Sequence, residues 1–123
     1  MEGDSLSVIK LKDILLVTVP DDPGDDIIQE LQTKVLNAME KYNSKGLLLD
    51  ISSVNVLDSF FARTISQTTQ MVALMGGRTI IAGMQPSVAI TATELGLSLG
   101  KALTTLDVDR ALDIFADSSS QLE

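Results

Sequence analysis

The chain has 123 residues, of which 45% are hydrophobic, and this length and composition suit one domain with a core of its own. Its 17 acidic residues outnumber the 9 basic ones, and the net charge of −8 disfavours binding to nucleic acid or to an anionic membrane. The absence of Cys and His excludes thiol nucleophiles, Ser-His-Asp triads and metal sites built from thiolates or imidazoles.

Two short apolar runs begin the chain. Residues 5–12 alternate apolar and polar side chains, Asp13 interrupts the pattern, and residues 14–19 (ILLVTV) form a second β-rich run. Two such runs with a brief break between them predict an antiparallel hairpin. The acidic stretch 20–26 (PDDPGDD) lacks the spacing of an EF-hand calcium loop, so it is interpreted as a solvated turn.

The next segment repeats apolar residues at spacings of three and four, which predicts a helix with one apolar face. The apolar positions are Ile27, Ile28, Leu31, Val35, Ala38, Met39 and Tyr42. Asp25 or Asp26 is expected to cap this helix, because carboxylates accept hydrogen bonds from the free N–H groups at a helix start. Residues 45–52 (KGLLLDIS) then predict a strand buried on both faces, as in a parallel sheet.

A second helix is predicted to follow the pair Asp58-Ser59, since both residue types cap helices. The positions expected to point inward are Phe61, Ile65, Thr68, Val72 and Met75. Gly76-Gly77 should end the helix, because glycine readily adopts the left-handed conformation that follows many helices. Residues 78–83 (RTIIAG) predict the next buried strand.

The last third of the chain predicts a short helix over 86–95, with Pro86 at its first position and Gly96 at its end. A weak strand over 101–106 and a helix over 107–116 follow. Asp107 should cap the final helix, and its inward positions are Val108, Ala111, Leu112 and Phe115.

The predicted order is β-β-α-β-α-β-α-β-α, an α/β fold with a mixed sheet in which an N-terminal hairpin precedes strand-helix units. The domain is expected to span 1–117, with a flexible tail over 118–123. Right-handed crossovers bring the strand C-termini and the following helix N-termini to one edge of the sheet. The residues expected to share that edge are Asp58, Ser59, Gln85, Ser87 and Asp107.

Ser59 has two interpretations. As a helix cap, it would accept a free N–H group, and the pattern alone favours this role. As a phosphoacceptor, it would hold a phosphate of about −1.5 to −2 charges beside Asp58, at the positive end of the helix dipole. Arg63 follows one turn later and is either a partner of that phosphate or an ordinary solvated residue.

Phe60 and Phe61 cannot both point inward, because neighbouring helical positions differ by about 100°. Phe61 shares the period of the inward positions, so Phe60 is either an exposed contact residue or a smaller packing contact. Residues 83–90 (GMQPSVAI) lack the Lys and the second Gly of a phosphate-binding loop. Asp50 is the one candidate for acid–base chemistry, and its more ordinary role is to bond a neighbouring turn. We expect no metal, no cofactor and no enzyme activity.

The segments LLLDISSVNVLDSFFAR (47–63) and GGRTIIAGMQPSVAITATELGL (76–97) resemble the STAS domain and, within that family, the RsbS-type stressosome scaffolds. The likeness covers nearly all of the chain. The LLLD segment and the Asp-Ser pair are shared by STAS proteins generally, whereas 76–97 is more specific to stressosome members. At this length the chain is not expected to include the sensory domain of RsbR-type relatives, which tend to have Thr at the acceptor position.

The resemblance implies a non-catalytic protein in which Ser59 is phosphorylated by a protein-serine kinase and Asp58 is the acid before it. It implies co-assembly with RsbR-type relatives in a large particle, sequestration of an RsbT-type kinase, its release on phosphorylation, and resetting by an RsbX-type phosphatase. Phe60, Arg63, Gln85 and Ser87 would surround the phosphosite or dock the partner. We also expect a homodimer.

Two alternatives remain open. One is an anti-sigma factor antagonist that works alone, and the other is a STAS module that binds a nucleotide or small ligand, for which Arg63 and Lys101 are the candidate cations. The acidic N-terminus lacks the basic and apolar regions of a signal peptide. No apolar run approaches the ~20 residues of a membrane span, so a cytoplasmic location is expected.

Overall fold

The computed structural model describes residues 6–95 and 102–121. The elements are β1 (Ser7–Leu11), β2 (Ile14–Thr18), α1 (Asp25–Tyr42), β3 (Gly46–Asp50), α2 (Ser59–Leu74), β4 (Arg78–Ala82), α3 (Pro86–Glu94), β5 (Leu103–Thr105) and α4 (Val108–Gln121). The predicted order of strands and helices is confirmed. Gly96 and Lys101, which were assigned roles above, lie outside the described residues.

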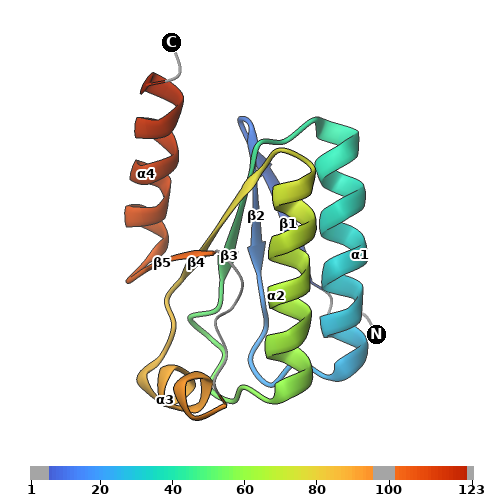
Figure 1. Ribbon diagram of the computed structural model, residues 1–123, viewed down its shortest axis with the longest axis vertical. Helices are drawn as coiled ribbons and strands as arrows, with labels where there is room; N and C mark the ends of the chain where they lie inside the picture. The colour runs from blue at the N-terminus through green and yellow to red at the C-terminus, as the bar shows by residue number, and fades with distance from the viewer. Residues whose placement is uncertain (1–5, 96–101, 122–123) are drawn as a thin grey trace.

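The strands form one mixed sheet in the order β1-β2-β3-β4-β5. β1 and β2 pair antiparallel as the predicted hairpin, while β2, β3, β4 and β5 pair parallel with their neighbours. Helices α1 and α2 cover one face of the sheet, and α4 lies against the other (Figure 1). This is the single α/β domain with a mixed sheet that the apolar pattern predicted.

Side-chain alternation divides the core between the two faces of the sheet. The side chains packed toward α1 and α2 include Leu15, Val17, Leu47, Leu49 and Ile81. Those packed toward α4 include Ile14, Leu48, Ile80, Ala82 and Phe115. Because β3 contributes fully buried residues to both faces, its continuous apolar run is explained by its central place in the sheet.

Helix ends account for several wrong expectations. The N-cap of α1 is Gly24, which has no side chain to bond, so neither Asp25 nor Asp26 is the cap; both lie in the first turn, where their charge suits the helix dipole. Tyr42 and Met75 are exposed rather than inward, because each lies where its helix ends.

Helix α4 continues to Gln121, past the predicted end at residue 116, because no Gly or Pro follows Phe115 to stop it. Among residues 6–95 and 102–121, no helix combines the length and the hydropathy needed to cross a lipid bilayer.

Thr79→Val is expected to raise the free energy of unfolding by about 1 kcal/mol, because the buried Thr79 hydroxyl has no hydrogen-bond partner among the described residues. Thr68→Val is the matched control, since that hydroxyl donates to the Thr64 carbonyl at 2.7 Å and accepts from Gln32 Nε2 at 3.1 Å. Urea denaturation should show that the free energy of unfolding of this control is lower than that of wild type by about 1–2 kcal/mol. An equal fall in the free energy of unfolding of both variants would contradict the finding that the Thr79 hydroxyl has no hydrogen-bond partner among the described residues.

Candidate functional site

The carboxyl ends of the parallel strands meet at one edge of the sheet, as the topology requires. The Ile51 N–H donates to the Ala82 carbonyl at 3.0 Å, and the Gly83 N–H donates to the Thr105 carbonyl at 3.1 Å. The loops that follow β3, β4 and β5 are therefore hydrogen-bonded side by side. They lead into the N-termini of α2, α3 and α4.

Asp58, and not Ser59, is the N-cap of α2. Its backbone is extended (φ −108°, ψ 175°), and its Oδ1 accepts the Phe61 N–H at 2.8 Å. This bond contributes about 1 kcal/mol to a typical helix start. Ser59 is the first helical residue, its side chain is exposed, and its hydroxyl makes no hydrogen bond with any residue that the structure describes. The interpretation of Ser59 as a cap is therefore wrong, and its hydroxyl is available to chemistry.

The residues after Ser59 divide between core and solvent. Phe61 is buried, as predicted, and Phe60 is half-buried with its ring packed against the same core cluster. Of the two roles considered for Phe60, the smaller packing contact is the observed one. Arg63 is exposed one turn beyond Ser59 and has no ion pair within the described part of the chain.

Gln85 and Ser87 hold the loop that leads to Ser59. Gln85 Nε2 donates to the Ser52 carbonyl at 2.8 Å, and Ser87 Oγ donates to the Asn55 carbonyl at 3.3 Å. Neither residue bonds Ser59 itself. Both act on the backbone four to seven positions before it, so the geometry assigns them a positioning role.

The start of the same loop is fixed from two sides. Asp50 Oδ1 accepts the Ser52 N–H at 3.0 Å, which is the ordinary strand-end role considered for this carboxylate. Gly83 has φ 81°, and a Cβ built on it would lie 2.8 Å from the Ser52 Cβ. The loop between β3 and α2 can therefore pack against β4 only where residue 83 lacks a side chain.

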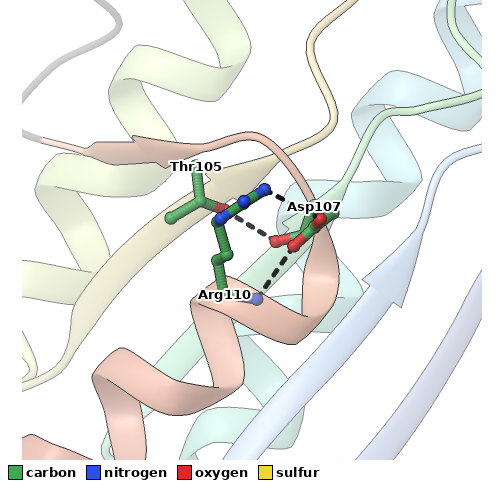
Figure 2. A network of polar contacts seen from close by, with 3 residues as sticks. All are labelled: Thr105, Asp107 and Arg110. Carbon is green, nitrogen blue, oxygen red and sulfur yellow. Dashed lines mark hydrogen bonds and ion pairs between the residues drawn. The ribbon is translucent and has the colours of Figure 1, made fainter.

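Asp107 caps α4, as predicted, and its carboxylate is fully engaged. Figure 2 shows its contacts with Thr105 and Arg110: Oδ1 accepts the Arg110 N–H at 2.9 Å, and Oδ2 pairs with the Arg110 guanidinium at 3.1 Å. Thr105 Oγ1 donates to the Asp107 carbonyl at 2.9 Å. Asp107 therefore organises the neighbouring turn and makes no hydrogen bond to Ser59 or to the loop before it.

A shallow pocket of about 290 Å³ lies beside this turn at the same sheet edge. Its lining includes the carboxylates of Asp50, Asp107 and Asp109, and it does not include Ser59. Acidic walls repel phosphate groups, so this pocket does not suit a nucleotide. Within residues 6–95 and 102–121, no group of three or more Asp and Glu residues is arranged to hold a metal ion.

Several exposed apolar residues near the site were not predicted, and Val56 and Ile90 are the ones on the segments next to Ser59. Val56 lies in the loop before α2, and Ile90 lies on α3, away from its buried residues Val88 and Ala92. Neither residue fits the regular spacing of the buried apolar residues around it. An apolar residue that breaks this spacing is the signal in the sequence that could have identified them.

The comparisons with known proteins agree with the fold. The family model described as the STAS domain matches residues 8–111. RsbT co-antagonist protein RsbRA of Bacillus subtilis (strain 168) is 33% identical over 76 residues, a stretch that covers 62% of this chain and 28% of that protein. The chain thus spans less than a third of the length of this relative.

Two solved structures cover almost the whole chain. A serine-to-glutamate variant of RsbS from Moorella thermoacetica has a TM-score of 0.83 and is 28% identical, with 94% of this chain and 97% of that chain covered. A chain from the stressosome, described as a signal integration and transduction hub, has a TM-score of 0.77 and is 27% identical, with 92% and 98% covered.

Proposed function

The chain belongs to the STAS domain family, and on that basis we propose that it is a non-catalytic stressosome scaffold. In this proposal it sequesters an RsbT-type serine/threonine kinase and releases it when Ser59 is phosphorylated. The observation that supports it best is the free hydroxyl of Ser59, which stands exposed at the first position of α2 because Asp58 makes the capping bond.

The similarities support some of the proposed partners. Likeness to RsbS and to a stressosome chain supports assembly in a large cytoplasmic particle, and likeness to an RsbT co-antagonist supports an RsbR-type co-scaffold and an RsbT-type kinase. An RsbX-type phosphatase would reset the phosphorylated state, and a homodimer would be the building unit.

The position of Ser59 favours a phosphate chemically. The first N–H groups of α2 lack intrahelical partners, and the helix dipole places partial positive charge there. Arg63 can reach back one turn to the phosphate. The local charge would fall by about 1.5 to 2 units beside Asp58, on a surface where a partner docks.

Release of the kinase would result from desolvation. Unmodified Ser59 presents a small hydroxyl at the helix start, which a partner can cover at little cost. A phosphate in the same place is strongly hydrated, and burying it without a cationic partner costs several kcal/mol. Arg63 and the part of Phe60 that is not packed in the core are the neighbours through which that change would act.

Mixing the protein with an RsbR-type relative and sizing the mixture by light scattering tests the scaffold proposal. We expect a discrete particle many times larger than either chain. A small heterocomplex would instead favour the stand-alone anti-sigma factor antagonist. The nucleotide-binding alternative has no supporting observation, because the pocket at the sheet edge is lined by carboxylates.

A further inference from the structure

We propose that Val56 and Ile90 form an apolar contact, bordered by carboxylates, on which the kinase docks. This inference rests on the proposed function and names the surface and the chemistry of the partner: an apolar patch with Lys or Arg residues around it. The apolar contact would set how long the complex lasts, and the carboxylates would set how fast it forms.

The two residues lie on segments that are hydrogen-bonded to each other. Val56 is 64% exposed and lies three positions before Ser59. Ile90 is 59% exposed and lies one turn beyond Ser87, whose hydroxyl bonds the carbonyl of Asn55 next to Val56. In Figure 1, α3 lies beside the start of α2 at the lower end of the molecule. The patch therefore flanks the phosphosite.

Neither side chain has a structural role that explains its exposure. Ile90 points away from the core, since Val88 and Ala92 form the buried face of α3. Val56 lies between the buried residues Val54 and Leu57 but is itself in solvent. A single exposed apolar residue is common on protein surfaces. Two such residues on adjacent segments beside an exposed phosphosite suggest a contact with another protein.

Charge around the patch identifies the kind of partner. The exposed acids at this end of the molecule are Asp21, Asp22, Asp25, Asp26, Asp58, Glu94, Asp107 and Asp109. The described cations there are Arg63 and Arg110, and Arg110 is already paired with Asp107. An acidic partner would be repelled, whereas a kinase face with basic residues around an apolar centre would be attracted.

Added negative charge has opposite effects at the border of this surface and at its apolar centre. Charges at the border act at long range and mainly change the association rate. Apolar residues at the centre act only in close, dry contact and mainly change the dissociation rate. A phosphate on Ser59 would lie in that dry contact, away from the Lys and Arg residues around it, so it would be buried without a cationic partner and its effect would appear in dissociation.

Biolayer interferometry with the RsbT-type kinase of the source organism tests the surface. We compare Val56→Gln, Ile90→Gln and the double variant with Leu74→Gln, a control at the other end of α2 where Leu74 is 88% exposed. The double variant should dissociate about tenfold faster with little change in association rate. The Leu74 control should match wild type. Raising the ionic strength from about 0.05 M to about 0.3 M should slow association of every variant.

The outcomes separate this inference from the proposed function. A double variant with wild-type dissociation, or a Leu74 control equally impaired, overturns the docking surface. If phosphoserine at position 59 still releases the kinase in that case, the proposed function stands. If the double variant weakens binding but phosphoserine does not, the surface stands and the switch fails. A kinase that does not bind the wild-type chain contradicts both. Urea denaturation confirms that each variant is folded.

Discussion

Phosphorylation of Ser59 is expected to weaken binding of the RsbT-type kinase by at least about 100-fold, or roughly 2.7 kcal/mol. The hydroxyl is exposed at the first position of α2 and has no hydrogen-bond partner in the described part of the chain, and Asp58 already adds a negative charge beside it. A phosphate there adds about −1.5 to −2 charges, and a docked partner would have to cover them. Titration calorimetry with genetically encoded phosphoserine measures the change directly.

Two controls isolate the position and the charge. The kinase should bind the Ser59→Ala variant as tightly as it binds wild type, and adding ATP should not release it. Phosphoserine encoded in place of Gln70, an exposed residue farther along α2, adds the same charge away from the site and should leave binding within about threefold. Equal weakening by both phosphoserines would mean that overall charge, and not Ser59, controls the kinase. Ser59→Asp should have an intermediate effect, since one carboxylate is less charged than a phosphate.

Gly83→Ala is expected to lower the free energy of unfolding by about 2–4 kcal/mol. Gly83 has φ 81°, which strains any other residue, and an added Cβ would meet the Cβ of Ser52 at 2.8 Å and its Cα at 3.1 Å. The backbone of the loop before α2 would have to move, which would break the bond from Gln85 to Ser52. Slower phosphorylation of Ser59 should therefore accompany the lost stability.

Gly76→Ala is the matched control for this prediction. Gly76 has a similar φ of 90°, but an added Cβ there would meet nothing within 4 Å. Its free energy of unfolding should fall by only about 1–2 kcal/mol, which is the cost of the left-handed conformation for a residue with a side chain. Urea denaturation compares the free energies of unfolding of the two variants. The initial rate of Ser59 phosphorylation shows whether the loop before α2 has moved. Equal losses in stability would show that contact with Ser52 adds nothing to the cost at position 83.

The arrangement of strands and helices could be predicted because it follows from local apolar periods. The run at 47–49 is apolar on both faces, and this required a central parallel strand. Helix ends were less predictable, because their determinants are single residues. Asp58 and Ser59 are both good N-caps, and only the position at which the backbone turns into a helix decides between them.

The support of the site could be predicted only in part. Topology brought Gln85 and Ser87 to the edge that holds Ser59. Their actual role depends on bonds to the carbonyls of Ser52 and Asn55, more than 30 positions earlier in the chain. No local pattern encodes such contacts. The close approach of Gly83 to Ser52 likewise exists only once the strands have paired.

Mass mapping of the phosphosite decides whether Ser59 is the switch. The protein is incubated with the RsbT-type kinase and ATP, digested, and each phosphopeptide is sequenced. We predict phosphate on Ser59 in the wild-type chain and none anywhere in Ser59→Ala. Ser87 is the informative rival, because it is also exposed at this edge of the sheet. Phosphate on Ser87 or Thr64, with none on Ser59, would contradict the proposed switch.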